Sequence, residues 1–339
     1  MERIERLKRA VEDEEEIGPE LVMISPTDKC NLRCRTCWRR NKEGEEFERG
    51  LSLEKVKDIL NDCEKLDVRK IDLTGGGEPF LRNDIFEMIN AAKSRGFEVG
   101  LTTNASLLDQ DRVQRIVDLG MDEVLLSLDG LQETNDFLRG EGVFKDVMKA
   151  VKLFNKMKFD GALGFSTVIS SVNYDELFDV VKLAEENNLD YVNFIVLNVW
   201  DSNRQFSIEE IEDEVIQSLK DIKEFEKESK VSTNADNIIN YGLSEREPPE
   251  FCFAPWDMAF INASGEMMAC CTLASYYKNI LGNLEENSFY ELWTGEKMKA
   301  FREEIKNGEF PEKCNECLPD FIEKYNETCR RLEEHGFKD

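Results

Sequence analysis

Three cysteines, Cys30, Cys34 and Cys37, are the residues whose type and spacing point most directly to chemistry. They stand at C-x3-C-x2-C spacing on a short loop that follows the apolar run 21–24. Three thiolates can hold three irons of a cubane iron–sulfur cluster, which leaves the fourth iron free to bind a reactive ligand. A cluster that only carries electrons is normally closed by four protein ligands. The missing ligand therefore indicates a cluster that takes part in a reaction.

Zinc is the alternative metal for such a loop. Zinc sites usually space their thiols as C-x2-C and take a fourth ligand from another Cys or a His. The only histidine of the chain is His335, near the far terminus. We therefore interpret the three cysteines as an open iron–sulfur site and keep zinc as the competing interpretation.

A second motif, TGGGEP at residues 74–79, follows the next apolar segment. A glycine run alone commonly indicates a turn. Here it stands between a strand-like run, 69–73, and a helix-like run, 84–94, and its glycines would let backbone groups approach a bound amino acid closely. Together with the cysteine loop, the motif resembles the radical S-adenosylmethionine superfamily.

The resemblance implies a cofactor and its contacts. In this family the open iron binds the amino and carboxylate groups of S-adenosylmethionine, and one-electron reduction cleaves the cofactor to a 5′-deoxyadenosyl radical. The stretch SLDGLQETNDFLRG at 127–140 is similar to that of the peptide- and sugar-modifying branches. The implied cofactor-binding residues are Gly76, Gly77, Glu78, Pro79, Asn104, Ser127 and Arg139.

One position departs from the family pattern. The residue before the third cysteine is usually aromatic in the family and packs near the adenine, whereas this chain has Thr36. Trp38, just beyond the triad, is the candidate replacement.

A second set of cysteines lies in the C-terminal third of the chain. A C-x12-G-x4-C element followed by a distant C-x2-C resembles the twitch domain, the short form of the SPASM domain. The four candidate ligands are Cys252, Cys270, Cys314 and Cys317. Four thiolates would close an auxiliary cluster, and a zinc knuckle is the alternative. With S-adenosylmethionine, we therefore expect two [4Fe-4S] clusters, one that binds this cofactor and one auxiliary.

The other cysteines receive separate interpretations. If 266–273 forms a strand, Cys270 and Cys271 point to opposite faces, and Cys271 either faces the substrate cavity as a hydrogen-atom donor or fills a core. Helical spacing with apolar neighbours assigns Cys63 to the core. The same spacing favours the core for Cys329, with a spare cluster ligand as the alternative.

The elements that must position these residues follow from the apolar periodicity. Between 21 and 197, six β-rich runs alternate with five helical runs, which predicts an α/β fold with a parallel sheet and right-handed crossovers. The motifs at 30–37, 75–79, 103–104 and 127–130 each follow a predicted strand. Ligands of such sheets bind at the carboxyl ends of the strands, so the motifs are expected to share one site. The resemblance implies a partial (β/α)6 barrel.

Changes in pattern predict the domain boundaries. We expect a helical lead at 1–18, the barrel at 19–200 and an acidic helical linker at 201–249, which ends at Pro248 and Pro249. A small α+β twitch or SPASM-like cluster domain is expected at 250–320, followed by a C-terminal helix at 321–339.

Composition limits the partners. The chain has 339 residues, 41% of them apolar, and a formal charge of −27, which argues against a nucleic-acid partner. No apolar run approaches the roughly 20 residues that span a bilayer, and the amino terminus has no signal-peptide core, so we expect a cytoplasmic protein without a membrane partner. The window 28–42 reverses the trend, with six basic residues against one acidic residue. It is either a docking patch for an acidic electron donor or anionic substrate, or a solvated loop.

The resemblance implies a radical enzyme that depends on S-adenosylmethionine, and we expect reduced ferredoxin or flavodoxin as its electron donor. Twitch-bearing relatives imply oxidation (dehydrogenation) or epimerisation of a sugar-like or cyclitol small molecule. Maturation of a ribosomally made peptide is the alternative, favoured less because only a short lead precedes the barrel. A non-catalytic iron–sulfur electron carrier or a zinc-binding protein is the alternative of another class, and the motif at 76–79 argues against it.

Overall fold

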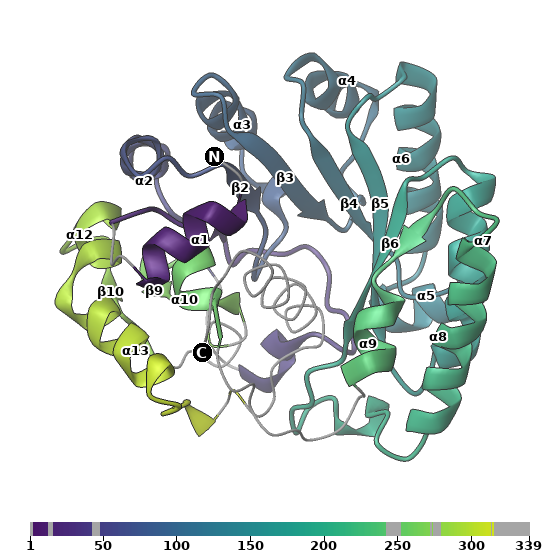
Figure 1. Ribbon diagram of the computed structural model, residues 1–339. Coiled ribbons are helices and arrows are strands. Elements are labelled where there is room, and N and C mark those ends of the chain that lie inside the picture. The colour runs from purple at the N-terminus through teal and green to yellow at the C-terminus, as the bar shows by residue number, and fades with distance from the viewer. Residues whose placement is uncertain are drawn as a thin grey trace.

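The computed structural model describes residues 3–12, 16–42, 48–241, 252–271, 273, 279–312 and 314. Among these residues a single sheet has the strand order β10-β9-β8-β1-β2-β3-β4-β5-β6-β7. Figure 1 shows the central strands enclosed on their outer side by helices. The predicted α/β class with a parallel sheet is confirmed.

The alternation of strands and helices agrees closely with the sequence periodicity. The predicted strands are β1 (Leu21–Ile24), β2 (Lys70–Leu73), β3 (Glu98–Thr103), β4 (Glu123–Ser127), β5 (Ala162–Ile169) and β6 (Tyr191–Val196). The predicted helices are α2 (Leu53–Lys65), α3 (Ile85–Lys93), α4 (Gln110–Asp118), α6 (Val143–Met157) and α7 (Leu177–Glu186). A further helix, α5 (Gln132–Arg139), was not expected from the apolar pattern.

Side-chain alternation along the strands creates the site. Val22, Ile24, Ile71 and Leu73 are fully or almost fully buried and belong to the main apolar core. Successive strand residues point to opposite faces, so the other face of the sheet carries residues such as Ser127, which line a cavity. The same strands thus hold the core on one face and the site on the other.

The segment expected as an acidic linker continues the barrel pattern. It contains α8 (Glu212–Glu226), the two-residue strand β7 (Ser232–Thr233) and α9 (Ala235–Tyr241). Strand β7 pairs in parallel with β6 and adds one more strand to the sheet after α8. A strand of two residues has no detectable alternation, which is why the sequence pattern did not reveal it.

The C-terminal region joins the same sheet. After α10 (Ala254–Asp257), strand β8 (Met258–Ile261) pairs in parallel with β1, and β9 (Glu266–Met268) and β10 (Gly282–Asn283) extend the sheet antiparallel. Helices α12 (Phe289–Thr294) and α13 (Glu296–Lys306) follow. The expected terminal helix at 321–339 lies outside the described residues.

Hydrogen bonds fasten this region to the amino-terminal half. Lys55 of α2 donates to the carbonyl of Leu284 at 2.6 Å, and the Trp293 indole donates to the carbonyl of Ile17 at 2.9 Å, just after helix α1 (Arg3–Glu12). No helix in the described ranges is both long and apolar enough to cross a membrane.

Candidate active site

A cavity of about 280 Å³ lies at the carboxyl ends of strands β2 to β6. It brings together all three cysteines of the first motif and most of the expected cofactor contacts. These lining residues are Cys30, Cys34, Cys37, Gly76, Gly77, Glu78, Asn104, Ser127 and Arg139. Trp38 and Thr36 also line it. Pro79 is buried in the 3-10 turn Pro79–Leu81, which adjoins the cavity-lining motif.

The cysteine loop is irregular backbone held by short-range hydrogen bonds. The amide of Cys37 donates to the carbonyl of Cys34 at 3.3 Å, and the 3-10 turn Trp38–Lys42 follows. Burial raises the pKa of the Cys34 thiol to about 11, although the charge of Arg139 acts to lower it. Burial also raises the pKa of Cys37. Metal binding must therefore supply the positive charge that keeps these sulfurs as thiolates.

The glycine motif packs directly on the cysteine loop. A Cβ atom on Gly77 would lie 2.2 Å from the carbonyl oxygen of Lys29 and 2.5 Å from that of Thr27. The next residue, Glu78, donates its amide hydrogen to the same Lys29 carbonyl at 2.7 Å. Only glycine permits this approach. The motif thus supports the cluster loop as well as lining the cavity.

The Glu78 side chain joins the ends of two strands. Its buried carboxylate accepts hydrogen bonds from the Thr103 hydroxyl at 2.7 Å and from the Asn104 amide at 2.8 Å. Burial raises the pKa of Glu78, and these hydrogen bonds oppose the shift. The Asn104 side chain in turn donates to Asn31 at 3.1 Å and lies 3.8 Å from the sulfur of Cys30.

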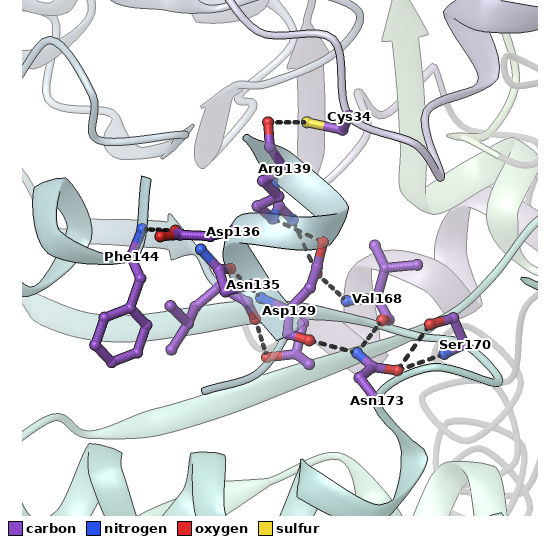
Figure 2. Close-up of polar contacts among 11 residues, drawn as sticks. Cys34, Asp129, Asn135, Asp136, Arg139, Phe144, Val168, Ser170 and Asn173 are labelled. Atoms are coloured by element: carbon purple, nitrogen blue, oxygen red, sulfur yellow. Dashed lines mark hydrogen bonds and ion pairs between the residues drawn. The ribbon is translucent and has the colours of Figure 1, made fainter. Parts of the chain in front are cut away.

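Arg139 is held by Asp129, a pairing that the sequence did not predict. Its Nε lies 2.7 Å from Oδ2 of Asp129, and its Nη2 donates to Oδ1 at 2.9 Å. Figure 2 shows this pair beneath Cys34. Burial acts to lower the pKa of Arg139, but the charge of Asp129, its hydrogen bond and the neighbouring Cys34 and Cys37 together outweigh burial and leave that pKa raised. Asp129 stands within the SLDG stretch, which marks the residue as a candidate but does not indicate its pairing with Arg139.

The loop after β6 contributes a second unforeseen contact. The buried Asn203 side chain donates to the carbonyl of Thr36 at 3.0 Å and to the carbonyl of Asn198 at 3.0 Å. Asn198 lines the cavity. Asn203 therefore ties one wall of the cavity to the segment between Cys34 and Cys37.

The donor set fits an iron–sulfur cluster with an amino-acid ligand. Three thiols, a guanidinium and amide groups face one cavity. In a cubane each thiolate binds its own iron, so three thiols that line one cavity suit a cluster.

The second cysteine set is described in part. Cys252 precedes α10, Cys270 follows β9 by two residues, and Cys314 follows α13; all three are half-buried. Cys317 lies outside the described residues, as does Cys329. Cys63 is fully buried in the core, as expected.

The expectation that separated Cys271 from Cys270 rested on a longer strand. Strand β9 ends at Met268, and Cys271 lies in helical backbone. The side-chain alternation of a strand therefore does not apply to this pair. The role of Cys271 as a hydrogen donor stays a prediction without that geometric support.

Comparisons with known proteins agree with this site. The family model described as the radical SAM superfamily matches residues 24–184. The SPASM model, described as an iron–sulfur cluster-binding domain, matches residues 252–318. The two matches contain both sets of cysteines.

Two curated relatives are similar over most of both chains. A tungsten-containing aldehyde ferredoxin oxidoreductase cofactor-modifying protein of Pyrococcus furiosus is 26% identical over 87% of this chain and 86% of its own. An AdoMet-dependent heme synthase of Methanosarcina barkeri is 25% identical over 92% of this chain and 90% of its own.

Solved structures share the fold. SuiB of Streptococcus suis, bound to S-adenosylmethionine, has a TM-score of 0.67 at 18% identity and covers 86% of this chain and 69% of its own. The anSMEcpe complex with AdoMet and the Cp18Cys peptide has a TM-score of 0.66 at 19% identity and covers 93% of this chain and 99% of its own. The chain therefore belongs to the radical SAM superfamily: it is a radical SAM enzyme with a SPASM domain, and its cofactors are S-adenosylmethionine and [4Fe-4S] clusters.

Proposed function

We propose that this enzyme abstracts a hydrogen atom from a small-molecule substrate and releases an oxidised product. The observation that carries the proposal is the single cavity that holds three thiols and the Arg139 guanidinium at the carboxyl ends of the strands. When bound, the open cluster with S-adenosylmethionine supplies a 5′-deoxyadenosyl radical, and an auxiliary cluster supplies an electron acceptor. The removal of one hydrogen atom, one electron and one proton oxidises the substrate by two electrons.

The residues of this chain bind and orient. Cys30, Cys34 and Cys37 would hold the open cluster, and Arg139 would pair with the carboxylate of the cofactor. Trp38 lies against the glycine motif, because a Cβ on Gly76 would be 3.2 Å from its ring. We assign Trp38 the adenine-packing role that Thr36 does not fill. The cavity walls keep water from the reacting atoms.

The substrate is proposed to be the precursor of a cofactor. The two relatives that match over at least 86% of both chains are named for modifying the cofactor of a tungsten enzyme and for heme synthesis. This similarity supports a cofactor precursor over the sugar-like or cyclitol substrate that the twitch resemblance implied. Peptide complexes among the structural neighbours have identities below 20% and support the fold alone.

Oxidation is preferred to epimerisation. Cys252, Cys270, Cys314 and Cys317 make up four candidate ligands, and a closed cluster suits electron acceptance. Epimerisation would instead require a hydrogen donor such as Cys271. The test is to run the reaction in deuterated water. An isomeric product that carries one deuterium, and that Cys271→Ser no longer forms, would show epimerisation and contradict oxidation.

The electron donor is proposed to be an acidic ferredoxin or flavodoxin that docks on the basic loop surface. We define this surface by the exposed residues Lys29, Arg33, Arg35 and Arg40. Beside it, Phe137 is 47% exposed, and the Arg35 guanidinium lies 4.3 Å from its ring centre. The overall charge of −27 would repel an acidic protein from the rest of the surface. The basic loop surface would therefore attract the electron donor and orient it as it approaches.

Metal content and cofactor cleavage test the proposal. Anaerobically reconstituted protein should carry about eight irons, as two cubanes require. The triple variant Cys30→Ala, Cys34→Ala, Cys37→Ala should lose about four irons and all dithionite-driven formation of 5′-deoxyadenosine. Cys63→Ala, which removes a buried thiol outside the cavity, is the matched control and should keep both. Persistent 5′-deoxyadenosine in the triple variant, or zinc in place of iron, would contradict the assignment.

A further inference from the structure

The side chain of Asp129 occupies one edge of the Arg139 guanidinium. Two contacts of 2.7 and 2.9 Å use Nε and Nη2, and the two side chains are only 1% and 11% exposed. A guanidinium has five N–H donors, so this side-on pair leaves the edge formed by Nη1 and Nη2 for a second acceptor. No described residue accepts a hydrogen bond from Nη1, and Arg139 lines the cavity. The free edge therefore suits a carboxylate in the cavity.

The backbone of Asp129 and one of its carboxylate oxygens are themselves held by hydrogen bonds. Its Oδ1 accepts from the Val168 amide at 2.8 Å, and its own amide donates to the Asn135 side chain at 2.9 Å. Its carbonyl accepts from the Asn173 side chain at 2.7 Å, which also donates to the Val168 carbonyl at 2.8 Å. Figure 2 shows these contacts converging on Asp129 from α5 and from β5 with its following loop. The three hydrogen bonds to Asp129 restrain the orientation of its carboxylate.

The last turn of helix α5, which contains Arg139, also holds the cysteine loop. The Arg35 amide donates to the carbonyl of Leu138 at 2.7 Å, and its Nε donates to the carbonyl of Phe137 at 2.8 Å. The sulfur of Cys34 lies 4.0 Å from the carbonyl oxygen of Arg139. The same helical turn therefore carries the guanidinium and positions the thiols.

From these contacts we propose that Asp129 is the positioning residue that sets the direction in which Arg139 presents its free edge to the cofactor carboxylate, without touching the cofactor. This proposal rests on the proposed role of Arg139. A positioning role and a purely electrostatic role predict opposite changes in affinity when Asp129 is replaced. Loss of the negative charge alone would raise the positive potential at the site and tighten binding of a carboxylate. Loss of the orientation of Arg139 would weaken that binding.

The test measures the dissociation constant of S-adenosylmethionine under anaerobic conditions, together with iron content. Asp129→Asn keeps the size of the side chain and should weaken binding about tenfold, as loss of a charge-assisted hydrogen bond does. Asp190→Asn is the matched control, because the Asp190 side chain accepts from the Leu163 amide at 2.8 Å near the start of β5 and shares no hydrogen-bond partner with Asp129 among the described residues. It should leave affinity within about twofold, as expected for a site without shared partners.

The double variant Asp129→Asn, Arg139→Gln tests whether Asp129 acts through Arg139. It also avoids leaving Arg139 as a buried unpaired charge. If Asp129 acts through Arg139, the double variant binds no more weakly than Arg139→Gln alone. Unchanged or tighter binding in Asp129→Asn, or additive losses in the double variant, would overturn the proposal. Unchanged binding in Arg139→Gln would instead reject the role of Arg139 itself, which separates the two failures.

Discussion

At the scale of single residues, Gly77 of the TGGGEP motif matters because it has no Cβ, which allows the cysteine loop to pack closely against it. Gly77 touches backbone of the cysteine loop, and backbone cannot move aside as a flexible side chain can. The position of Gly77 therefore sets how closely the loop after β2 approaches the cluster ligands.

Gly77→Ala is therefore expected to reduce iron at the first cluster. The added Cβ would lie 2.2 Å from the Lys29 carbonyl oxygen, so the cysteine loop must shift. We expect a loss of up to about four of about eight irons. Gly308→Ala is the control, because its φ of 75° costs backbone strain while its Cβ meets nothing within 4 Å. Equal iron content in both variants would contradict this role.

At the scale of elements, the loop after β6 and the cysteine loop form one unit through Asn203. Replacement of Asn203 by Ala leaves the carbonyls of Thr36 and Asn198 without this donor, at a cost of about 1–3 kcal/mol. Faster hydrogen exchange in residues 30–40 should report the loss. Asn187→Ala removes a comparable bond, 2.8 Å to the Leu183 carbonyl, far from the cavity and should leave that exchange unchanged.

Because β8 pairs with β1, we expect the stability of the barrel to depend on the C-terminal cluster domain. A chain that ends at residue 241 loses β8 and leaves β1 with an unpaired edge. It also loses the bonds from Lys55 and Trp293. We expect aggregation, or a midpoint of thermal unfolding lowered by more than about 5 °C. A truncated chain as stable and monomeric as the full chain would show that the barrel is independent of the cluster domain.

At the scale of the whole molecule, charge distribution governs the encounter with the electron donor. Arg33→Gln with Arg40→Gln should slow ferredoxin- or flavodoxin-driven cleavage of S-adenosylmethionine about three- to tenfold at low salt, because rim charges act mainly on association. Cleavage driven by dithionite should not change. Lys152→Gln with Lys156→Gln, also exposed but on α6, is the control. An equal effect of both pairs would refute a directed docking surface.

The sequence by itself determined the α/β architecture, the two cysteine sets and the convergence of Cys30, Gly76, Asn104 and Ser127 at one edge of the sheet, whereas Arg139 came from the family resemblance alone. These follow from local periodicity and from the rule that parallel strands present their carboxyl ends together.

Only the tertiary structure decided the pairing of Asp129 with Arg139, the bond from Asn203 to Thr36 and the addition of β8 to β1. The polar contacts join side chains to partners that follow no sequence period. The strand pairing joins segments more than 200 residues apart, and its hydrogen bonds come from the backbone, which is the same for every residue type except proline. No local pattern could therefore identify either partner.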